Sequence, residues 1–432
     1  MAEQAGVTRG ARLKSILGGS AGNLVEWYDW YAYAAFALYF APHFFPADDP
    51  TSELLNSAGV FALGFLMRPL GGWLMGIYSD RRGRKAGLAL SITLMCAGSL
   101  LIAITPTYQT IGAWAPALVI LARLLQGLSV GGEYGASATY LSEIASRRHR
   151  GFFASFQYVT LISGQLVALS VLLILQATLG KGALEAWGWR IPFVIGGVLA
   201  VSVYWLRRGL IESESFRKVE AAAEGPRSSF WKLLKEHPRE SATVLFLTAG
   251  GTLAFYAYSI YMQKFLVDTS GFSKESASRI NAGALLVFMC LQPAVGALSD
   301  RIGRKPLMVA FGVLGTLLTY PIFTTLEGVR DPWTAWAIVS GALVIVSGYS
   351  AISGVVKAEM FPAHIRTLGV ALPYAIANAI FGGTAEAVAF WFKRDLAWQR
   401  GFYWYVTAMI AISLITYLRM RDTRTHSLIV ED

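Results

Sequence analysis

The chain has 432 residues, of which 55% are hydrophobic and only 15% are charged, whereas soluble domains carry roughly 25% charged residues. This balance argues against a water-soluble multidomain enzyme. The formal net charge is +10, which by itself is compatible with nucleic-acid binding, so the positions of the charges must decide. The two cysteines, Cys96 and Cys290, lie far apart in apolar runs and predict neither a disulfide framework nor a metal cluster.

Long uncharged stretches recur along the chain, and about 20 predominantly apolar residues are enough to cross a bilayer as a helix. Such runs occupy 86–122, 151–180, 191–206, 241–263, 280–299, 306–326, 333–356, 367–385 and 401–418. The run at 86–122 divides in two at Pro106 and Pro116. Three further apolar segments contain charges: 15–41, 54–79 and a continuation of the fourth helix to residue 142. We therefore expect an all-α membrane protein with twelve transmembrane helices.

The distribution of Lys and Arg predicts the topology. With the N-terminus placed in the cytoplasm, most basic residues fall in the cytoplasmic connections, which is the positive-inside pattern. The basic surplus is thus a topology signal, and we expect no nucleic-acid partner. The polar stretch 207–240 separates six spans from six. It predicts a six-helix bundle at 1–206, a cytoplasmic linker at 207–240, a second bundle at 241–432, and both termini in the cytoplasm.

The two halves share a motif at an offset of 220 residues: GIYSDRRGRK at 76–85 and GALSDRIGRK at 296–305. A second echo sets Glu143 and Arg150 against Glu359 and Arg366. Duplicated halves around a midplane site are the architecture of one large group of transporters. The motif predicts ion pairs and a tight glycine turn, with simple topological charge as the alternative. Its residues are Asp80, Arg81, Gly83, Arg84, Lys85, Asp300, Arg301, Gly303, Arg304 and Lys305.

The repeated motif resembles the signature loop of the major facilitator superfamily. Four further segments, GNLVEWYD at 22–29, MRP at 67–69, QGLSVGGEY at 126–134 and WGWRIP at 187–192, resemble the metabolite:proton symporters of that superfamily. Segments at 151–160, 261–264, 357–362 and 377–383 are similar to those of carriers for α-ketoglutarate. The resemblance covers nearly the whole chain. It implies a symporter that imports a small dicarboxylate by alternating access, with H⁺ as the coupling ion and no cofactor or metal, and a motif that stabilises the outward-open state.

Ionisable side chains within a bilayer are costly, so each is a functional hypothesis. Six interrupt the predicted spans: Glu26, Asp29, Arg68, Arg123, Glu133 and Glu386. All but Glu386 lie in the first half of the chain. A symporter requires an acid that gains and loses a proton, and Glu26, Asp29 and Glu133 are the candidates. The alternative is that these charges only pair with one another and hold the bundle together.

A dicarboxylate requires fixed cations, and Arg matches a carboxylate with two parallel hydrogen bonds. Arg123, near the midplane, is the first candidate. Lys264, at the outer end of the seventh span, is a second cation, with snorkelling to the interface as its alternative. Arg68 fits either a substrate or a proton role. Polar side chains in apolar helices are further candidates, with helix-to-helix hydrogen bonding as the alternative: Gln157, Tyr158, Gln165, Tyr256 and Asn378.

Other functions are kept as alternatives. A related symporter could carry citrate, a shikimate-like or aromatic acid, or a zwitterion such as proline or betaine. A passive channel or a membrane-embedded enzyme is a different class. However, the sequence shows no His, Cys or Ser constellation near an interface and no GxxxxGK[ST] nucleotide motif. We expect a monomer that works in the bacterial inner membrane.

Overall fold

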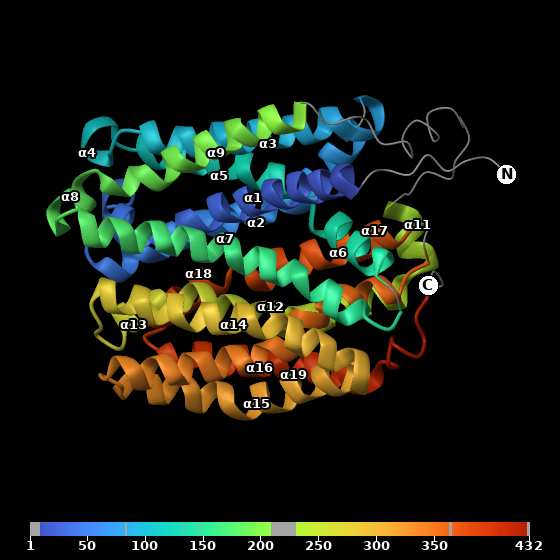
Figure 1. The fold of residues 1–432 in the computed structure, drawn as a ribbon. Coiled ribbons are helices and arrows are strands. Elements are labelled where there is room, and N and C mark those ends of the chain that lie inside the picture. Colours follow the sequence, from blue (N-terminus) through green and yellow to red (C-terminus); the bar gives the residue numbers. More distant parts are fainter. Residues whose placement is uncertain are drawn as a thin grey trace.

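The computed structural model describes residues 9–82, 84–131, 133–145, 147–208, 230–362 and 365–429. Every regular element within these ranges is a helix. The elements of the first half are α1 (Arg9–Phe44), α2 (Pro50–Arg82), α3 (Arg84–Ile104), α4 (Tyr108–Ile111), α5 (Trp114–Val130), α6 (Glu133–Ile144), α7 (Arg150–Thr178), α8 (Lys181–Ala186), η1 (Gly188–Arg190) and α9 (Ile191–Arg208). Figure 1 shows them in blue to green, in the upper part of the view.

The second half begins with the short helix α11. Its elements are α11 (Phe230–Glu236), α12 (Pro238–Tyr256), η2 (Ala257–Tyr261), α13 (Met262–Asp268), α14 (Lys274–Ile302), α15 (Arg304–Gly328), α16 (Pro332–Glu359), α17 (Arg366–Ala377), η3 (Asn378–Gly382), α18 (Ala385–Arg394) and α19 (Gln399–Arg419). Most of them occupy the lower part of Figure 1, from yellow to red, whereas α11 and α17 lie at the height of α6. We call the end of the molecule that carries α11 and residues 300–305 the motif end, and the opposite end the far end.

The helix count agrees with the twelve predicted spans. Eight helical segments among the described residues are long and apolar enough to cross a membrane. Three shorter apolar helices, at Leu90–Ile104, Trp114–Val130 and Gly188–Ser202, together with α1, account for the remaining spans. Residues 209–229 of the predicted linker lie outside the described residues, and α12 begins at Pro238, shortly before the predicted boundary at 241. The domain boundaries therefore stay predictions.

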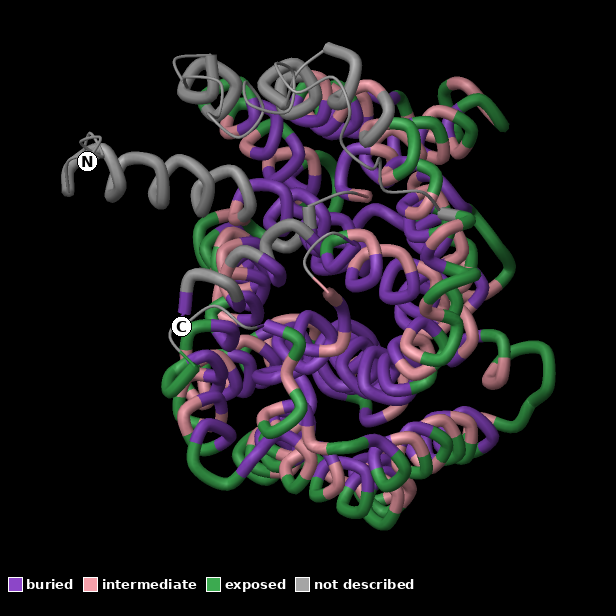
Figure 2. The backbone as a smooth tube through the Cα atoms, turned by 90° about the vertical axis from the view of Figure 1, so that its right-hand side faces the viewer, coloured by how far each residue is buried: buried purple, intermediate pink, exposed green. Residues whose placement is uncertain are grey.

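The burial pattern is that of a helical bundle surrounded by lipid. Figure 2 looks along the helices and shows buried residues around the interior and exposed residues mainly around the perimeter. Large apolar side chains are exposed on many helices, among them Trp73, Ile104, Ile174, Leu317 and Trp404. Soluble monomers seldom expose so much contiguous apolar surface. A hydrocarbon environment removes the cost of exposing it.

Local sequence explains where several helices begin and end. Ser273 precedes α14 and its hydroxyl accepts the backbone N–H of Ser276 at 3.1 Å. Asp331 precedes α16 and accepts the N–H of Thr334 at 2.7 Å. These contacts satisfy N–H groups that the helix itself leaves free. Gly303 separates α14 from α15 with a φ of 101°, a conformation that favours glycine.

Two spans of the second half contain a π-helical segment. The π-helix η2 joins α12 to α13, and η3 lies between α17 and α18. The N–H of Gly383, which follows η3, donates to the carbonyl of Asn378 at 2.7 Å. Short π segments within α-helices occur frequently at functional sites because they redirect side chains locally.

Glycines let α2 and α5 approach each other closely. A Cβ atom on Gly127 of α5 would lie 2.2 Å from the carbonyl oxygen of Gly64 of α2. A Cβ on Gly131 would lie 2.2 Å from the carbonyl oxygen of Arg68. Small residues commonly bring helices together in membranes. This packing fixes the distance between Arg68 on α2 and Arg123 on α5.

The close contact at Gly127 leads to a testable prediction about stability. We expect Gly127→Ala to lower the free energy of unfolding by about 1–3 kcal/mol because the added methyl group overlaps backbone atoms of α2. Gly341→Ala is the matched control, since no atom lies within 4 Å of a Cβ at that helical position. The measurement is the thermal unfolding midpoint of both variants in detergent. Equal midpoints would contradict the packing described for α2 and α5.

Candidate functional site

A chain of hydrogen bonds links Arg123 of α5 to Asp29 of α1. Nη1 of Arg123 donates to Oε1 of Gln126 at 2.7 Å, and Nε2 of Gln126 donates to Oδ2 of Asp29 at 2.6 Å. The other carboxylate oxygen of Asp29 accepts from the hydroxyl of Ser99 on α3. All four side chains are buried. The cation and the acid are therefore joined through a neutral amide and not by a direct ion pair.

Two arginines lie against one tryptophan at this site. The guanidinium carbons of Arg68 and Arg123 lie 4.2 and 4.0 Å from the centroid of the Trp30 ring. Arg68 also lies 4.0 Å from the Phe65 ring centroid, and Arg123 lies 4.6 Å from that of Tyr33. Aromatic faces attract cations without neutralising them. Among the described residues neither arginine forms an ion pair, so their positive charges remain available to an anion.

The second bundle reaches this site through its π segments. The ring of Tyr256, at the end of α12, lies 5.2 Å from that of Phe65, against which Arg68 also packs. Tyr256 and Asn378 both lie beside Gly382. Asn378, the first residue of η3, accepts a hydrogen bond from Thr252 at 2.6 Å. Three of the predicted binding residues, Arg68, Tyr256 and Asn378, are thus brought together although they come from three different helices and from both halves of the chain.

Lys264 lies in a closed ion pair. Its Nζ is 3.1 Å from Oε2 of Glu386, and both side chains are almost entirely inaccessible to solvent. This burial excludes the snorkelling alternative for Lys264 in this conformation. The partner acid neutralises the ammonium group, which distinguishes Lys264 from the two arginines.

The three predicted polar residues of α7 are all buried where α7 faces the second bundle. Nε2 of Gln165 donates to the backbone carbonyl of Ser259 in η2 at 2.9 Å, which matches the helix-to-helix alternative for this residue. Tyr158 packs edge-on against Phe255, with ring centroids 5.6 Å apart. Gln157 is 2% exposed. The amide of Gln165 therefore ties α7 to η2, next to Tyr256.

The structure describes the surroundings of the three acids predicted for proton coupling to different extents. Asp29 is fully buried and hydrogen-bonded as given above. Glu26 is also buried, almost one helical turn earlier on α1. The side chain of Glu133 lies outside the described part of the chain. Of the three, Asp29 has a described connection to a candidate substrate arginine.

One buried cation, Lys357, is not among the candidate residues predicted from the sequence. It lies in the last turn of α16, with its Nζ 3.3 Å from the hydroxyl of Tyr134 and 4.3 Å from the ring centroid of Tyr374. The uncharged run ends at residue 356, which places Lys357 at the start of a connecting loop. The structure continues the helix to Glu359 and buries the lysine completely.

At the motif end, Asp300 connects the two halves. Its carboxylate accepts the backbone N–H groups of Gly151 and Phe152 at 2.8 and 2.9 Å, at the N-terminus of α7. A helix N-terminus carries a partial positive charge and free N–H groups, so it binds a carboxylate well. Nη1 of Arg304 donates to the same carboxylate at 2.7 Å. The second copy of the motif thus holds the first bundle through a charge at a helix end.

A second acid, Glu359, completes this connection. Arg304 and Arg150 lie 3.5 and 3.9 Å from its carboxylate, and the hydroxyl of Thr423 donates to it at 2.6 Å. Arg150 and Glu359 belong to the second sequence echo, and here they meet across the two halves. We call Asp300, Arg304, Glu359 and Arg150 the motif-end latch.

The other motif residues have smaller roles in this conformation. Nζ of Lys305 donates to the carbonyl of Leu418 at 2.8 Å, and the carbonyl of Arg301 accepts from Arg424 at 2.8 Å. Gly303 provides the predicted turn. In the first copy, Gly83 and the side chains of Asp80, Arg81, Arg84 and Lys85 lie outside the described part of the chain.

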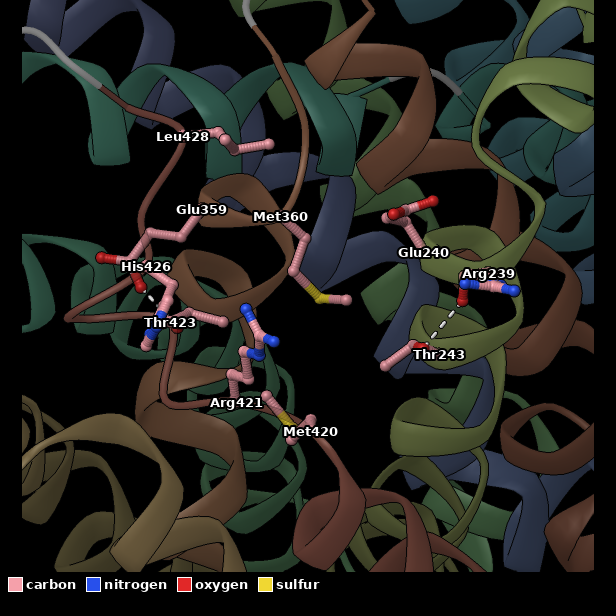
Figure 3. A pocket seen from close by; sticks show the side chains of 10 residues that line it. All are labelled: Arg239, Glu240, Thr243, Glu359, Met360, Met420, Arg421, Thr423, His426 and Leu428. Carbon is pink, nitrogen blue, oxygen red and sulfur yellow. Dashed lines mark hydrogen bonds between the residues drawn. The ribbon is translucent and has the colours of Figure 1, made fainter.

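A cavity of about 300 Å³ opens beside the latch (Figure 3). Arg239, Glu240, Arg421 and His426 contribute polar groups to its wall, and Glu359 connects it to the latch. It lies at the motif end, away from Trp30 and its two arginines. Among the described residues, no three His, Cys, Asp or Glu side chains are placed to hold a metal ion.

The latch gives a prediction about opening at the motif end. Ser155, one turn into α7, is buried close to Gly296. A cysteine placed there, with Cys96 and Cys290 replaced, reports exposure through its rate of reaction with a water-soluble thiol reagent. We expect Asp300→Asn to raise this rate by at least about fivefold, because hydrogen bonds to a charged group are worth roughly 1.5–3 kcal/mol.

The matched control is Asp331→Asn, which removes a helix-capping carboxylate at the far end. It should leave the rate at Ser155→Cys unchanged. Equal rates in the Asp300→Asn and unsubstituted backgrounds would show that this carboxylate does not hold the two halves together.

Comparison with known proteins identifies the family. The family model for sugar (and other) transporters matches residues 16–220 and again residues 210–430. The α-ketoglutarate permease of Escherichia coli (strain K12) is 52% identical over 409 residues, which cover 95% of this chain and 94% of that protein. The citrate-proton symporter of Salmonella typhi is 35% identical over 88% of each chain.

A solved structure supports the fold. The crystal structure of a D-xylose-proton symporter superposes with a TM-score of 0.74 at 18% identity, over 95% of this chain and 98% of that chain. At this identity the likeness shows the fold alone, and it confirms the predicted two-bundle, twelve-helix architecture. The chain is a multi-pass membrane transporter, not an enzyme, and it belongs to the sugar (and other) transporter family of the major facilitator superfamily.

Proposed function

We propose that this protein is a proton-coupled symporter that imports a small dicarboxylate, α-ketoglutarate in the first place. The names of the relatives, an α-ketoglutarate permease and a citrate-proton symporter, support an organic-acid substrate and H⁺ as the coupling ion. The observation that carries the proposal is the pair of buried arginines at Trp30, neither of which has an ion-pair partner among the described residues. An anionic substrate would neutralise them.

In this proposal Arg68 and Arg123 bind one carboxylate of the substrate. Their planar guanidinium groups match a carboxylate with paired hydrogen bonds, and the aromatic rings hold them in place. Tyr256 and Asn378 donate to the keto oxygen or to the same carboxylate from the second bundle. Because these groups belong to both halves, substrate binding would draw the bundles together around the site.

Proton coupling is assigned to the acids of the first bundle, Glu26, Asp29 and Glu133. Asp29 has the described connection, since Gln126 joins its carboxylate to Arg123. A carboxylate bound at Arg123 weakens that arginine's stabilisation of the Asp29 anion and so favours protonation of Asp29. Moving a dianion against 100 mV costs roughly 4.6 kcal/mol, at about 2.3 kcal/mol per charge, so at least two protons would cancel its charge.

The motif-end latch is assigned a gating role, which it would share with the first copy of the motif. It joins the halves when the site is closed to the motif end and releases them when it opens to that side. We place the motif end in the cytoplasm of a bacterial inner membrane, with both termini there, because the basic residues concentrate at that end. The protein would act as a monomer of two bundles, 1–206 and 241–432, joined by a linker at 207–240.

A carrier of a larger organic acid such as citrate is the alternative that the second relative supports. The two arginines would serve either substrate, so competition decides between them. A zwitterion would require a fixed anion beside the cations. Asp29, which Gln126 joins to Arg123, is already hydrogen-bonded to Gln126 and Ser99.

Uptake measurements test the proposed function. We expect purified protein in liposomes to accumulate labelled α-ketoglutarate, and an inwardly directed proton gradient to stimulate the initial rate several-fold. Unlabelled α-ketoglutarate should compete more strongly than citrate or betaine. Uptake that is indifferent to the gradient would contradict proton coupling, and stronger competition by citrate or betaine would contradict the substrate.

A second prediction concerns the arginines. We expect Arg68→Gln and Arg123→Gln each to weaken α-ketoglutarate binding by about tenfold or more, because each removes a charge-assisted hydrogen bond of roughly 1.5–3 kcal/mol. The measurement is the dissociation constant of the purified protein by calorimetry. Arg330→Gln is the control, since Arg330 is exposed and its Nη1 donates to two backbone carbonyls near the end of α15. Unchanged affinity in Arg123→Gln would return Arg123 to a structural role.

A further inference from the structure

Lys357 is a fully buried ammonium surrounded by aromatic rings. Its Nζ lies 4.3 Å from the ring centroid of Tyr374, 5.3 Å from that of Tyr134 and 5.7 Å from that of Tyr349. Its one described hydrogen bond is to the hydroxyl of Tyr134, at 3.3 Å. We call these three tyrosines the aromatic cage. An ammonium carries three N–H donors, so a single partner leaves most of its hydrogen-bonding capacity unused.

Among the described residues no acid forms an ion pair with Lys357. Glu359, two residues further along α16, is bound instead to Arg304 and Thr423. Lys264 shows the usual solution for a buried lysine, a closed ion pair with Glu386. Because an unpaired charge within a membrane protein is costly, a position that retains one is a candidate for binding a mobile anion.

The cage is assembled from both halves of the chain. Tyr134 comes from α6, whereas Tyr349 and Lys357 come from α16 and Tyr374 comes from α17. The rings of Tyr134 and Tyr374 are stacked, with centroids 3.6 Å apart and planes 10° apart. A group held at Lys357 would therefore be enclosed only while the two bundles meet at this position.

The cage is continuous with the arginine site. Arg68 lies 4.0 Å from the ring centroid of Phe65, and the ring of Tyr256 lies 5.2 Å from that of Phe65. Tyr374 lies about one turn before Asn378 on the same span, and Asn378 accepts a hydrogen bond from Thr252 of α12, about one turn before Tyr256. Tyr158 of α7 packs against Phe255, whose ring lies 5.2 Å from that of Tyr256. Aromatic side chains thus lie between Arg68, in the first bundle, and Lys357, in the second. A dicarboxylate has one anionic group for each of these two positions.

We propose that Lys357 binds the second carboxylate of the transported dicarboxylate, while Arg68 and Arg123 bind the first. This inference rests on the proposed function and assigns the second cation to Lys357 in place of Lys264, which Glu386 already neutralises. The incoming carboxylate replaces the hydroxyl of Tyr134 as the acceptor for the ammonium. Lys357 is thus a specificity residue, because it binds the second negative charge, which a monocarboxylate lacks.

The test compares two acids that differ in this one charge. The dissociation constants of α-ketoglutarate and of 2-oxopentanoate, which has the same carbon chain and a single carboxylate, are measured on purified full-length protein. We expect Lys357→Met to weaken α-ketoglutarate binding at least tenfold and to change 2-oxopentanoate binding less than twofold. Lys357→Arg, which retains the charge, should restore most of the preference for the dicarboxylate.

Retained binding of 2-oxopentanoate shows that a variant is folded. If Lys357→Met binds neither acid, the same measurements are made on Lys357→Gln, whose side chain is polar and neutral. Lys235→Met, at an exposed position of α11, is the matched control and should behave like the unsubstituted protein. An unchanged preference in folded Lys357→Met or Lys357→Gln overturns the inference. The inference is also overturned if the double variant Lys264→Met/Glu386→Gln loses the preference for the dicarboxylate while the Lys357 variants keep it. Failure of the unsubstituted protein to bind α-ketoglutarate contradicts the proposed function instead.

Discussion

The structure depends on how charged groups are stabilised away from water. Isolated charges in a low-dielectric interior are expensive, so each must be paired, hydrogen-bonded or placed against aromatic rings. This protein uses all three solutions at different places. Lys264 and Glu386 form a closed pair, Asp300 binds a helix N-terminus, and Arg68 and Arg123 lie against Trp30. The first two solutions stabilise a conformation, whereas the third leaves positive charge for a ligand.

The same distinction separates the two kinds of contact between the bundles. At the motif end, the latch joins fixed groups of opposite charge, so its strength depends on the distance between the halves. At the centre, the facing groups are cations and tyrosine hydroxyls, which attract each other weakly. An anion placed between them supplies the missing attraction. A transporter that closes around its substrate requires this arrangement, because the empty site must not close too tightly on its own.

Sequence patterns predicted the fold and part of the site. Apolar run lengths gave the helices, and the repeated motif marked Asp300, Gly303 and Arg304, whose contacts the structure describes. The side chains with which these residues interact were harder to predict, because they depend on how the helices face one another. Glu386 follows Lys264 by 122 residues, and Gln126 stands between Arg123 and Asp29. Lys357 was missed because a charge at the end of an apolar run looks the same whether the helix stops or continues.

The π segments η2 and η3 also constrain how this sequence can change. Tyr256 comes just before η2 and Asn378 is the first residue of η3, whereas Lys264 and Glu386 pair beyond the two segments. Both pairs are separated by 122 residues, so the two helices remain in register across the two bulges. Deleting one residue from a single bulge would keep the first pair and rotate the members of the second apart. A one-residue deletion between the two pairs therefore calls for a matching deletion in the facing span if both pairs are to be kept.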